Sequence, residues 1–282
     1  MAHVALDVED LDVAVDFYVE LLGLAVIEEA SGAAYLACGG TNTYELVLRQ
    51  GEHRFDHVAF AVHGEAALEE VRDRLGMRGL EFTELDMSAE PGLAAGIETS
   101  LPCGHALRLV AESDPRGFRV RSAHAAVHHR GVGPVALEHI TLLCGDIGAT
   151  AAFGVDVLGL RVSDSVQPPG APWGNTHLRA GALHHDLGLL PGDAPAMHHF
   201  AFAVPSVSEV VAAADAIAAR GMAVDCSIGR HVAGNNVFVY FKDPAGHRLE
   251  VNTDMARVDA AAPPHIVETG VPFDAWRPGR PP

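Results

Sequence analysis

The side chains best suited to chemistry are two histidines and one glutamate in the second half of the chain. His139 opens the apolar run HITLL, His199 opens HFAFAV, and Glu250 lies in YFKDPAGHRLEV. Two neutral imidazoles and one carboxylate suit Fe(II) and leave coordination positions open on one side. Burying an unpaired carboxylate is costly, and a bound cation would offset that cost. We therefore expect these three residues to bind one metal ion; a polar core residue is the alternative for any single strand histidine.

The first half of the chain carries a different residue at the matching place. Glu250 lies 51 residues after His199, whereas the same count from His57 reaches Arg108. A guanidinium is a fixed cation with no lone pair to donate, so Arg108 would repel a metal ion. We expect the first half, with His3 and His57, to be structurally equivalent to the second half but without metal.

These residues belong to a segment that the chain repeats four times, beginning at His3, His57, His139 and His199. Each copy predicts a short strand, an amphipathic helix, a glycine and a second strand. The glycine follows after 20 residues in the first and third copies and after 22 residues in the second and fourth. Such strict offsets indicate a duplicated pair. Asp10, and Ser206 or Ser208, are expected to cap helices, and a curved sheet is needed to bring the three ligand candidates together.

The repeat divides the chain into two domains, residues 1–115 and 136–255. The stretch 116–135, rich in Ala, His and Gly, is expected to be a linker in which His128 and His129 are solvated. A Pro-rich tail, 256–282, has no periodic pattern and could be a lid, an oligomer contact or a disordered end.

Composition narrows the range of partners. Hydrophobic residues make up 49% and charged residues 20%, which is enough for a buried core. The net charge of -18 disfavours binding to nucleic acid. No apolar run approaches the roughly 20 residues that span a bilayer, and no secretory signal is visible. Four scattered cysteines (Cys38, Cys103, Cys144, Cys226) are expected to be reduced thiols of a cytoplasmic protein.

The segments LEHITLL, MHHFAF and YFKDPAGHRLEV resemble the ligand strands of the vicinal oxygen chelate superfamily, and in particular of the two-domain (type I) extradiol catechol dioxygenases, among them homoprotocatechuate-type and dihydroxybiphenyl-type members. The resemblance covers about residues 1–255. It implies an α+β fold of four βαβββ modules, paired into two domains with open barrel-like mixed sheets. It also implies that only the C-terminal domain binds metal, through His139, His199 and Glu250, with His198 pointing to the other face.

Five more positions follow from the resemblance. His185, 14 residues before His199, matches the acid–base histidine, with the adjoining His184 as the alternative. His231 and Tyr240, 19 and ten residues before Glu250, match a substrate-contacting histidine and a tyrosine that binds a catecholate oxygen. Thr141 and His177 occupy positions where some relatives carry Asn and a large aromatic residue. Both are expected to line the pocket for the aromatic ring, so the substrate is expected to differ from that of those relatives. His247 and the Asn235-Asn236 pair are expected to be structural, the latter as a turn.

The resemblance implies an enzyme that uses O₂ to open the ring of a catechol-type aromatic diol, at a bond outside its two hydroxyls. The metal is expected to be non-heme Fe(II); Mn(II) is the alternative, because the ligand set does not distinguish the two metals. A homo-oligomer without nucleic-acid or membrane partners is expected. The alternatives are another metalloenzyme on this scaffold, such as a glyoxalase-like isomerase or lyase, or a non-catalytic small-molecule-binding protein. Candidate partners for a carboxylated substrate, each with surface charge as the alternative, are Arg230, Arg248, Arg277 and Arg280.

Overall fold

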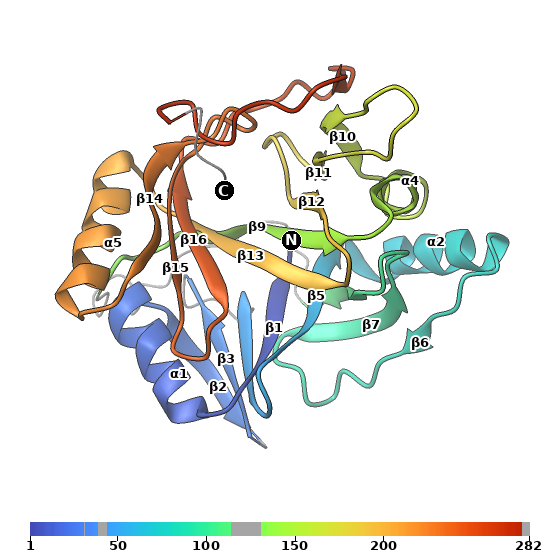
Figure 1. The fold of residues 1–282 in the computed structure, drawn as a ribbon. Coiled ribbons are helices and arrows are strands. Elements are labelled where there is room, and N and C mark those ends of the chain that lie inside the picture. Colours follow the sequence, from blue (N-terminus) through green and yellow to red (C-terminus); the bar gives the residue numbers. More distant parts are fainter. Residues whose placement is uncertain (31, 39–43, 114–130, 278–282) are drawn as a thin grey trace. The chain divides into compact units, whose positions relative to one another are not determined.

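The computed structural model describes residues 1–30, 32–38, 44–113 and 131–277, and these form two units (Figure 1). The first unit comprises residues 1–101, 105–137 and 243–247, and the second comprises 102–104, 138–242 and 248–282. Most of the expected linker, with His128 and His129, lies outside the described residues, as does Arg280. Among the described residues, no helix has both the length and the apolar character needed to cross a membrane.

The first unit contains two βαβββ modules in an eight-stranded sheet of order β2-β3-β4-β1-β5-β8-β7-β6. In each module the first strand pairs in parallel with the last, β1 with β4 and β5 with β8. The two first strands, β1 and β5, pair antiparallel and so join the modules. The elements are β1 (His3–Val8), α1 (Leu11–Phe17), η1 (Tyr18–Leu22), β2 (Ala25–Ala30), β3 (Ala33–Ala37), β4 (Leu46–Gln50), β5 (Arg54–Val62), α2 (Gly64–Met77), β6 (Thr83–Glu84), β7 (Leu93–Ser100) and β8 (Ala106–Glu112).

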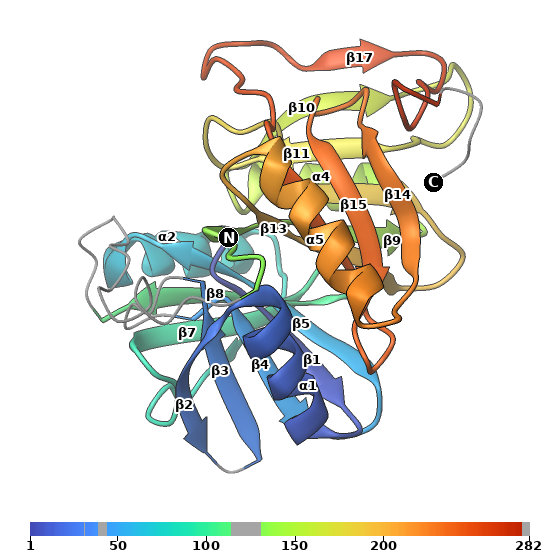
Figure 2. The same ribbon diagram turned by 90° about the vertical axis from the view of Figure 1, so that its left-hand side faces the viewer.

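The second unit repeats this plan in a nine-stranded sheet of order β14-β15-β16-β13-β9-β12-β11-β10-β17. Strand β9 pairs in parallel with β12, and β13 pairs in parallel with β16. Helix α5 lies over β15 in Figure 2 and packs against β14, β15 and β16. The elements are β9 (Ala136–Cys144), α4 (Ile147–Asp156), β10 (Arg161–Val166), β11 (Thr176–Arg179), β12 (Leu187–Pro191), β13 (Ala196–Ala203), α5 (Val207–Ala219), β14 (Val224–Arg230), β15 (Val237–Lys242), β16 (Arg248–Thr253) and β17 (His265–Val267). The predicted fold of four βαβββ modules is confirmed.

Local sequence explains where the helices begin and end. The side chains of Asp10 and Ser206, two of the predicted caps, accept hydrogen bonds from the backbone at the starts of α1 and α5. The repeated glycines terminate the helical segments in the left-handed region, with φ of 81° at Gly23 and 72° at Gly159. Helix α1 departs from the expected regular helix, because from Tyr18 it continues as one π-helical turn.

The described part of the Pro-rich tail, residues 256–277, packs along other segments of the second unit. Its strand β17 adds in parallel to β10 at the sheet edge. Further along, Asp274 is 1% exposed and accepts hydrogen bonds from the backbone of Trp276 and the side chain of Arg277. The tail therefore packs onto the second unit and covers the edge strand, which is otherwise a site for unwanted pairing.

Candidate functional site

Three ligand-type atoms converge inside the second sheet. His139 lies on β9, His199 on β13 and Glu250 on β16. The Nε2 atoms of the two histidines are 3.1 Å apart, and Oε2 of Glu250 lies 3.4 Å from Nε2 of His139 and 3.1 Å from Nε2 of His199. The three residues are 1%, 5% and 0% exposed. The parallel pairing of β13 with β16, which sets Glu250 opposite Ala201, fixes the glutamate near His199.

The electrostatics of this group fit a divalent cation. Burial raises the pKa of Glu250, but His139 and the hydrogen bonds from both histidines outweigh burial and hold that pKa well below its usual range. Burial opposes a charge on His139 too, yet Glu250 raises its pKa to about 9. Burial is the largest of the effects that lower the pKa of His199. A metal ion would take the place of the proton on His139 and would balance the charge of the Glu250 carboxylate.

The first unit shows how the same register serves a different purpose. His3 and His57 approach with their Nε2 atoms 3.0 Å apart, like the pair in the second unit. Strand β8 places Arg108 opposite Ala59, the register position that Glu250 holds opposite Ala201. The Arg108 guanidinium donates to Glu98 at 2.8 Å. A cation thus stands where the second unit has its carboxylate.

A cavity of about 700 Å³ opens beside the three ligand-type residues. Five residues that the family resemblance assigns to substrate binding or catalysis also line it: Thr141, His177, His185, His231 and Tyr240. The predicted carboxylate partners Arg230, Arg248 and Arg277 do not line it. His185 is 4% exposed, and its ring centroid lies 4.3 Å from that of His139. His184 is not part of the cavity wall, although its Nδ1 lies 3.1 Å from Nδ1 of His185.

His231 and Tyr240 form a hydrogen-bonded pair on one wall of the cavity. Nδ1 of His231 lies 3.2 Å from the backbone oxygen of Phe273, which can only accept, so Nδ1 donates. Nε2 of His231 must then accept from the Tyr240 hydroxyl at 3.0 Å. The His231 ring is stacked on Phe238 with centroids 4.0 Å apart. Burial, and then Glu250, raises the pKa of Tyr240 well above its ordinary value, so the hydroxyl keeps its proton.

The expectation that His198 points away from the site is wrong. His198 lines the cavity, and its Nδ1 lies 2.7 Å from Nδ1 of His199. Arg248 donates to Nε2 of His198 at 2.7 Å while its guanidinium lies 4.4 Å from the Tyr240 ring centroid. This arginine, anchored on Tyr240 and Asp225, holds the His198 ring against the wall despite strand alternation. Arg248 is thus committed to protein partners, as are Arg230 and Arg277.

Sequence reasoning missed three contributors to the site. Asn236 is fully buried and donates from Nδ2 to Oε1 of Glu250 at 2.8 Å, so the reading of Asn235-Asn236 as a turn holds only for Asn235, with φ of 59°. Asn175 lines the cavity from the loop before β11. Phe273 brings the tail into the cavity wall. A glutamate with one oxygen committed to a metal needs a donor for the other, and that was the available signal for Asn236.

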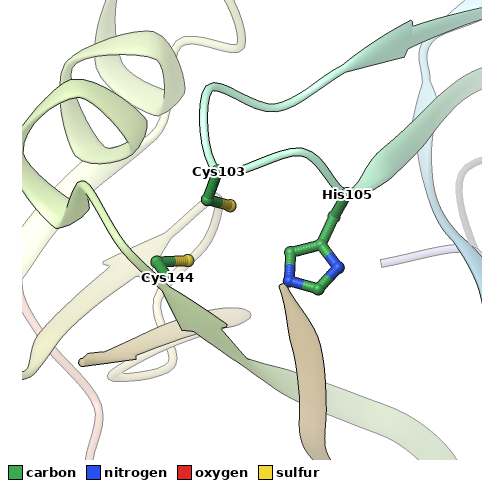
Figure 3. A group of neighbouring side chains, drawn as sticks. All are labelled: Cys103, His105 and Cys144. Atoms are coloured by element: carbon green, nitrogen blue, oxygen red, sulfur yellow. The ribbon is translucent and has the colours of Figure 1, made fainter. Parts of the chain in front are cut away.

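The cysteines are buried thiols. In the second unit, Cys103 and Cys144 lie next to each other (Figure 3). The hydrogen bond with Cys103, and then burial, raises the pKa of the Cys144 thiol. This keeps Cys144 protonated and away from the reactive thiolate form.

Comparisons with known proteins point to one superfamily. A family model described as the Glyoxalase/Bleomycin resistance protein/Dioxygenase superfamily matches residues 1–121 and 136–251. The chain is 24% identical over 261 residues to a manganese-dependent 2,3-dihydroxybiphenyl 1,2-dioxygenase of Geobacillus genomosp. 3, covering 88% of this chain and 83% of the relative. It is 25% identical over 281 residues to an iron-dependent extradiol dioxygenase of Rhodococcus jostii, covering 92% and 90%.

Solved structures agree on the fold. Homoprotocatechuate 2,3-dioxygenase from Arthrobacter globiformis matches with a TM-score of 0.87 and 25% identity, covering 100% of this chain and 88% of that one. A Mn(II)-bound glyoxalase from Novosphingobium aromaticivorans matches with a TM-score of 0.81 and 25% identity, covering 97% and 89%.

Proposed function

We propose that this chain is an extradiol dioxygenase that opens a catechol-type diol with O₂. The proposal starts from the family: the chain belongs to the glyoxalase/bleomycin resistance protein/dioxygenase superfamily. One observation carries the proposal. Two imidazole nitrogens and a carboxylate oxygen converge at the wall of a cavity of about 700 Å³ that also exposes further histidines and a tyrosine. A non-catalytic binding protein would not need such a set of groups able to donate and accept protons.

In this proposal His139, His199 and Glu250 hold Fe(II) or Mn(II). Both metals are named among the relatives, one iron-dependent and one manganese-dependent. When bound, the metal would lower the pKa of a coordinated diol hydroxyl and carry electron density from the ring to O₂. Asn236, by donating to the outer oxygen of Glu250, keeps the other oxygen aimed at His139 and His199.

Substrate orientation is assigned to His231 and Tyr240. The Tyr240 hydroxyl keeps its proton because burial raises its pKa. It can turn from Nε2 of His231 to an oxygen of the bound diol, and a hydrogen bond to a charged oxygen is about twice as strong as a neutral one. Phe238 and Phe273, which contact the His231 ring, hold this pair in place.

Proton transfer is assigned to His185. Burial, followed by nearby histidines, lowers its pKa well below the ordinary value, so the side chain enters the reaction neutral and able to accept a proton. In the proposal it takes a proton from the diol and returns it as the ring opens. Thr141, buried on β9, and His177 on β11 define the part of the cavity around the ring.

A glyoxalase-like reaction is the alternative function, because one of the similar solved structures is named a glyoxalase. An isomerase or lyase would consume no O₂. The test is to load the chain anaerobically with Fe(II) or Mn(II), add catechols one at a time, and admit O₂. The proposal expects O₂ uptake and a yellow ring-opened product; catechol binding without O₂ uptake would refute it.

Cellular location and assembly are two further parts of the proposal. Four buried thiols suit the reducing cytoplasm, and the net charge of -18 disfavours nucleic acid. We propose that the enzyme is cytoplasmic and forms a homo-oligomer. Fractionation of cells tests the location, and sedimentation of the purified chain tests the assembly.

A further inference from the structure

A series of hydrogen bonds links His185 to His177, two residues of the cavity wall, through His184 and Asp164. Nδ1 of His185 lies 3.1 Å from Nδ1 of His184. The other nitrogen of His184, Nε2, lies 3.2 Å from Oδ2 of Asp164. The second oxygen of Asp164 lies 2.6 Å from Nδ1 of His177. All four residues are in the second unit, and Asp164 on β10 links two histidines that would otherwise be independent.

With His184 neutral, the donors and acceptors of this series allow only one order of protons. An ionised carboxylate only accepts, so Nε2 of His184 must carry the hydrogen that faces Asp164. A neutral His184 then has a bare Nδ1, which can only accept from Nδ1 of His185. His185 is left with a bare Nε2. The reverse order would set a lone pair of His184 against the carboxylate.

The carboxylate of Asp164 is suited to this task. Burial raises its pKa, but hydrogen bonds from His177 and His184 outweigh burial and keep the pKa below the ordinary value. The backbone also fixes His184, since Ser163 donates its hydroxyl to the His184 carbonyl and the His184 N–H donates to the backbone oxygen of Ala256 at 2.8 Å. These two bonds fix the backbone from which the His184 imidazole reaches Asp164.

We propose that Asp164 is a positioning residue that acts through His184, fixing His185 in the tautomer whose bare Nε2 serves as the base. This inference rests on the proposed function for its catalytic consequence, although the tautomers themselves do not depend on it. A buried carboxylate that orients a histidine in this way can be worth several orders of magnitude in kcat.

The direct test is the tautomer of each histidine. The 282-residue chain, labelled with ¹⁵N-histidine and loaded with diamagnetic Zn(II), is examined by long-range ¹H–¹⁵N spectroscopy. The proposal expects His184 protonated at Nε2 alone and His185 at Nδ1 alone. A wild-type His184 protonated at Nδ1 or at both nitrogens would overturn it. So would a second equivalent of Zn(II) per chain that Asp164→Asn abolishes, because Asp164, His177 and His184 could also enclose an ion.

The functional test compares Asp164→Asn with two controls. The amide can point its oxygen at His177, the closer partner, and its N–H at His184, which reverses both tautomers. We expect kcat to fall about 10²-fold or more with KM within about threefold and metal content unchanged. Asp164→Glu should restore most of kcat. Asp146→Asn, the same change at the N-cap of α4 where Asn also caps well, should leave kcat unaltered.

The outcomes separate the two proposals. Correct tautomers in a chain that consumes no O₂ would refute the dioxygenase and leave the positioning role of Asp164 standing. An active chain whose Asp164→Asn variant keeps both kcat and the tautomer of His184 would refute the positioning role alone. The His177→Phe substitution removes the other hydrogen-bond partner of Asp164. The His184 tautomer should stay the same in this variant. A changed His184 tautomer would contradict the proposal that Asp164 acts through His184.

Discussion

Replacing Glu250 by Gln is the sharpest perturbation of the proposed metal site. The change keeps the size of the side chain and removes one negative charge from a fully buried position 3.1 to 3.4 Å from two imidazole nitrogens. Asn236 donates to Oε1, so the amide oxygen of Gln would take that place and the amide N–H groups would face His139 and His199. A donor then stands where a metal needs a lone pair.

The expected magnitude follows from the lost charge. Two unit charges 4 Å apart interact by about 4 kcal/mol at an effective dielectric constant of about 20. A dication in contact with a carboxylate loses at least this much, and about 4 kcal/mol corresponds to a roughly 10³-fold weaker Kd. After dialysis, elemental analysis should therefore find close to one metal ion per wild-type chain and almost none in Glu250→Gln, and O₂ uptake should disappear with the metal.

A matched control lies at the same register position of the first unit. Arg108→Gln changes the residue opposite Ala59, as Glu250→Gln changes the residue opposite Ala201. We expect its metal content to stay at the wild-type level. A Glu250→Gln chain that retains metal and activity, or an Arg108→Gln chain that loses metal, would refute the assignment of the site to the second unit.

Three other substitutions test separate parts of the site and the fold. His185→Phe should retain metal and bind catechol while kcat falls about 10²-fold or more, because the proton acceptor is removed; loss of metal in the purified variant would refute its role. Tyr240→Phe should weaken transition-state binding by about 1.5–3 kcal/mol, the value of a hydrogen bond to a charged group, measured as kcat/KM; an unchanged kcat/KM would count against it. Burial lowers the pKa of His57, so the unfolded chain takes up a proton near 6.5 while the folded one does not, and unfolding free energy should fall as pH drops below about 6.5. His57→Asn, although less stable, should show a shallower fall from urea unfolding at pH 7.5 and 5.5, and an equally steep fall would contradict this account.

The sequence was sufficient to predict the four modules because their offsets repeat. A fixed count from His199 to Glu250 and from His57 to Arg108 corresponds to the same parallel register in both units, Ala201 with Glu250 and Ala59 with Arg108. Repetition thus allowed long-range neighbours to be inferred without coordinates. The same logic gave the terminating glycines, because each helix must end at the same distance from its strand.

Other features depend on tertiary contacts that no local pattern records. Local sequence predicts a turn at Asn235 and Asn236, yet the Asn236 amide donates to Glu250, 14 residues further along the chain. His198 alternates with His199 along β13, but Arg248 draws it to the cavity. Phe273 lies in a Pro-rich tail without periodicity and still contacts His231. In each case a long side chain or a loop bridges elements whose proximity only the folded chain defines.

The account as a whole is tested most directly by mass spectrometry of the product formed under ¹⁸O₂. The chain is loaded anaerobically with Fe(II), mixed with a catechol and exposed to labelled oxygen, and the mass of the product is recorded at early times. The account predicts a ring-opened product with the mass of the diol plus one molecule of O₂. A product with the mass of the starting diol, or no product while the metal is fully bound, would contradict it.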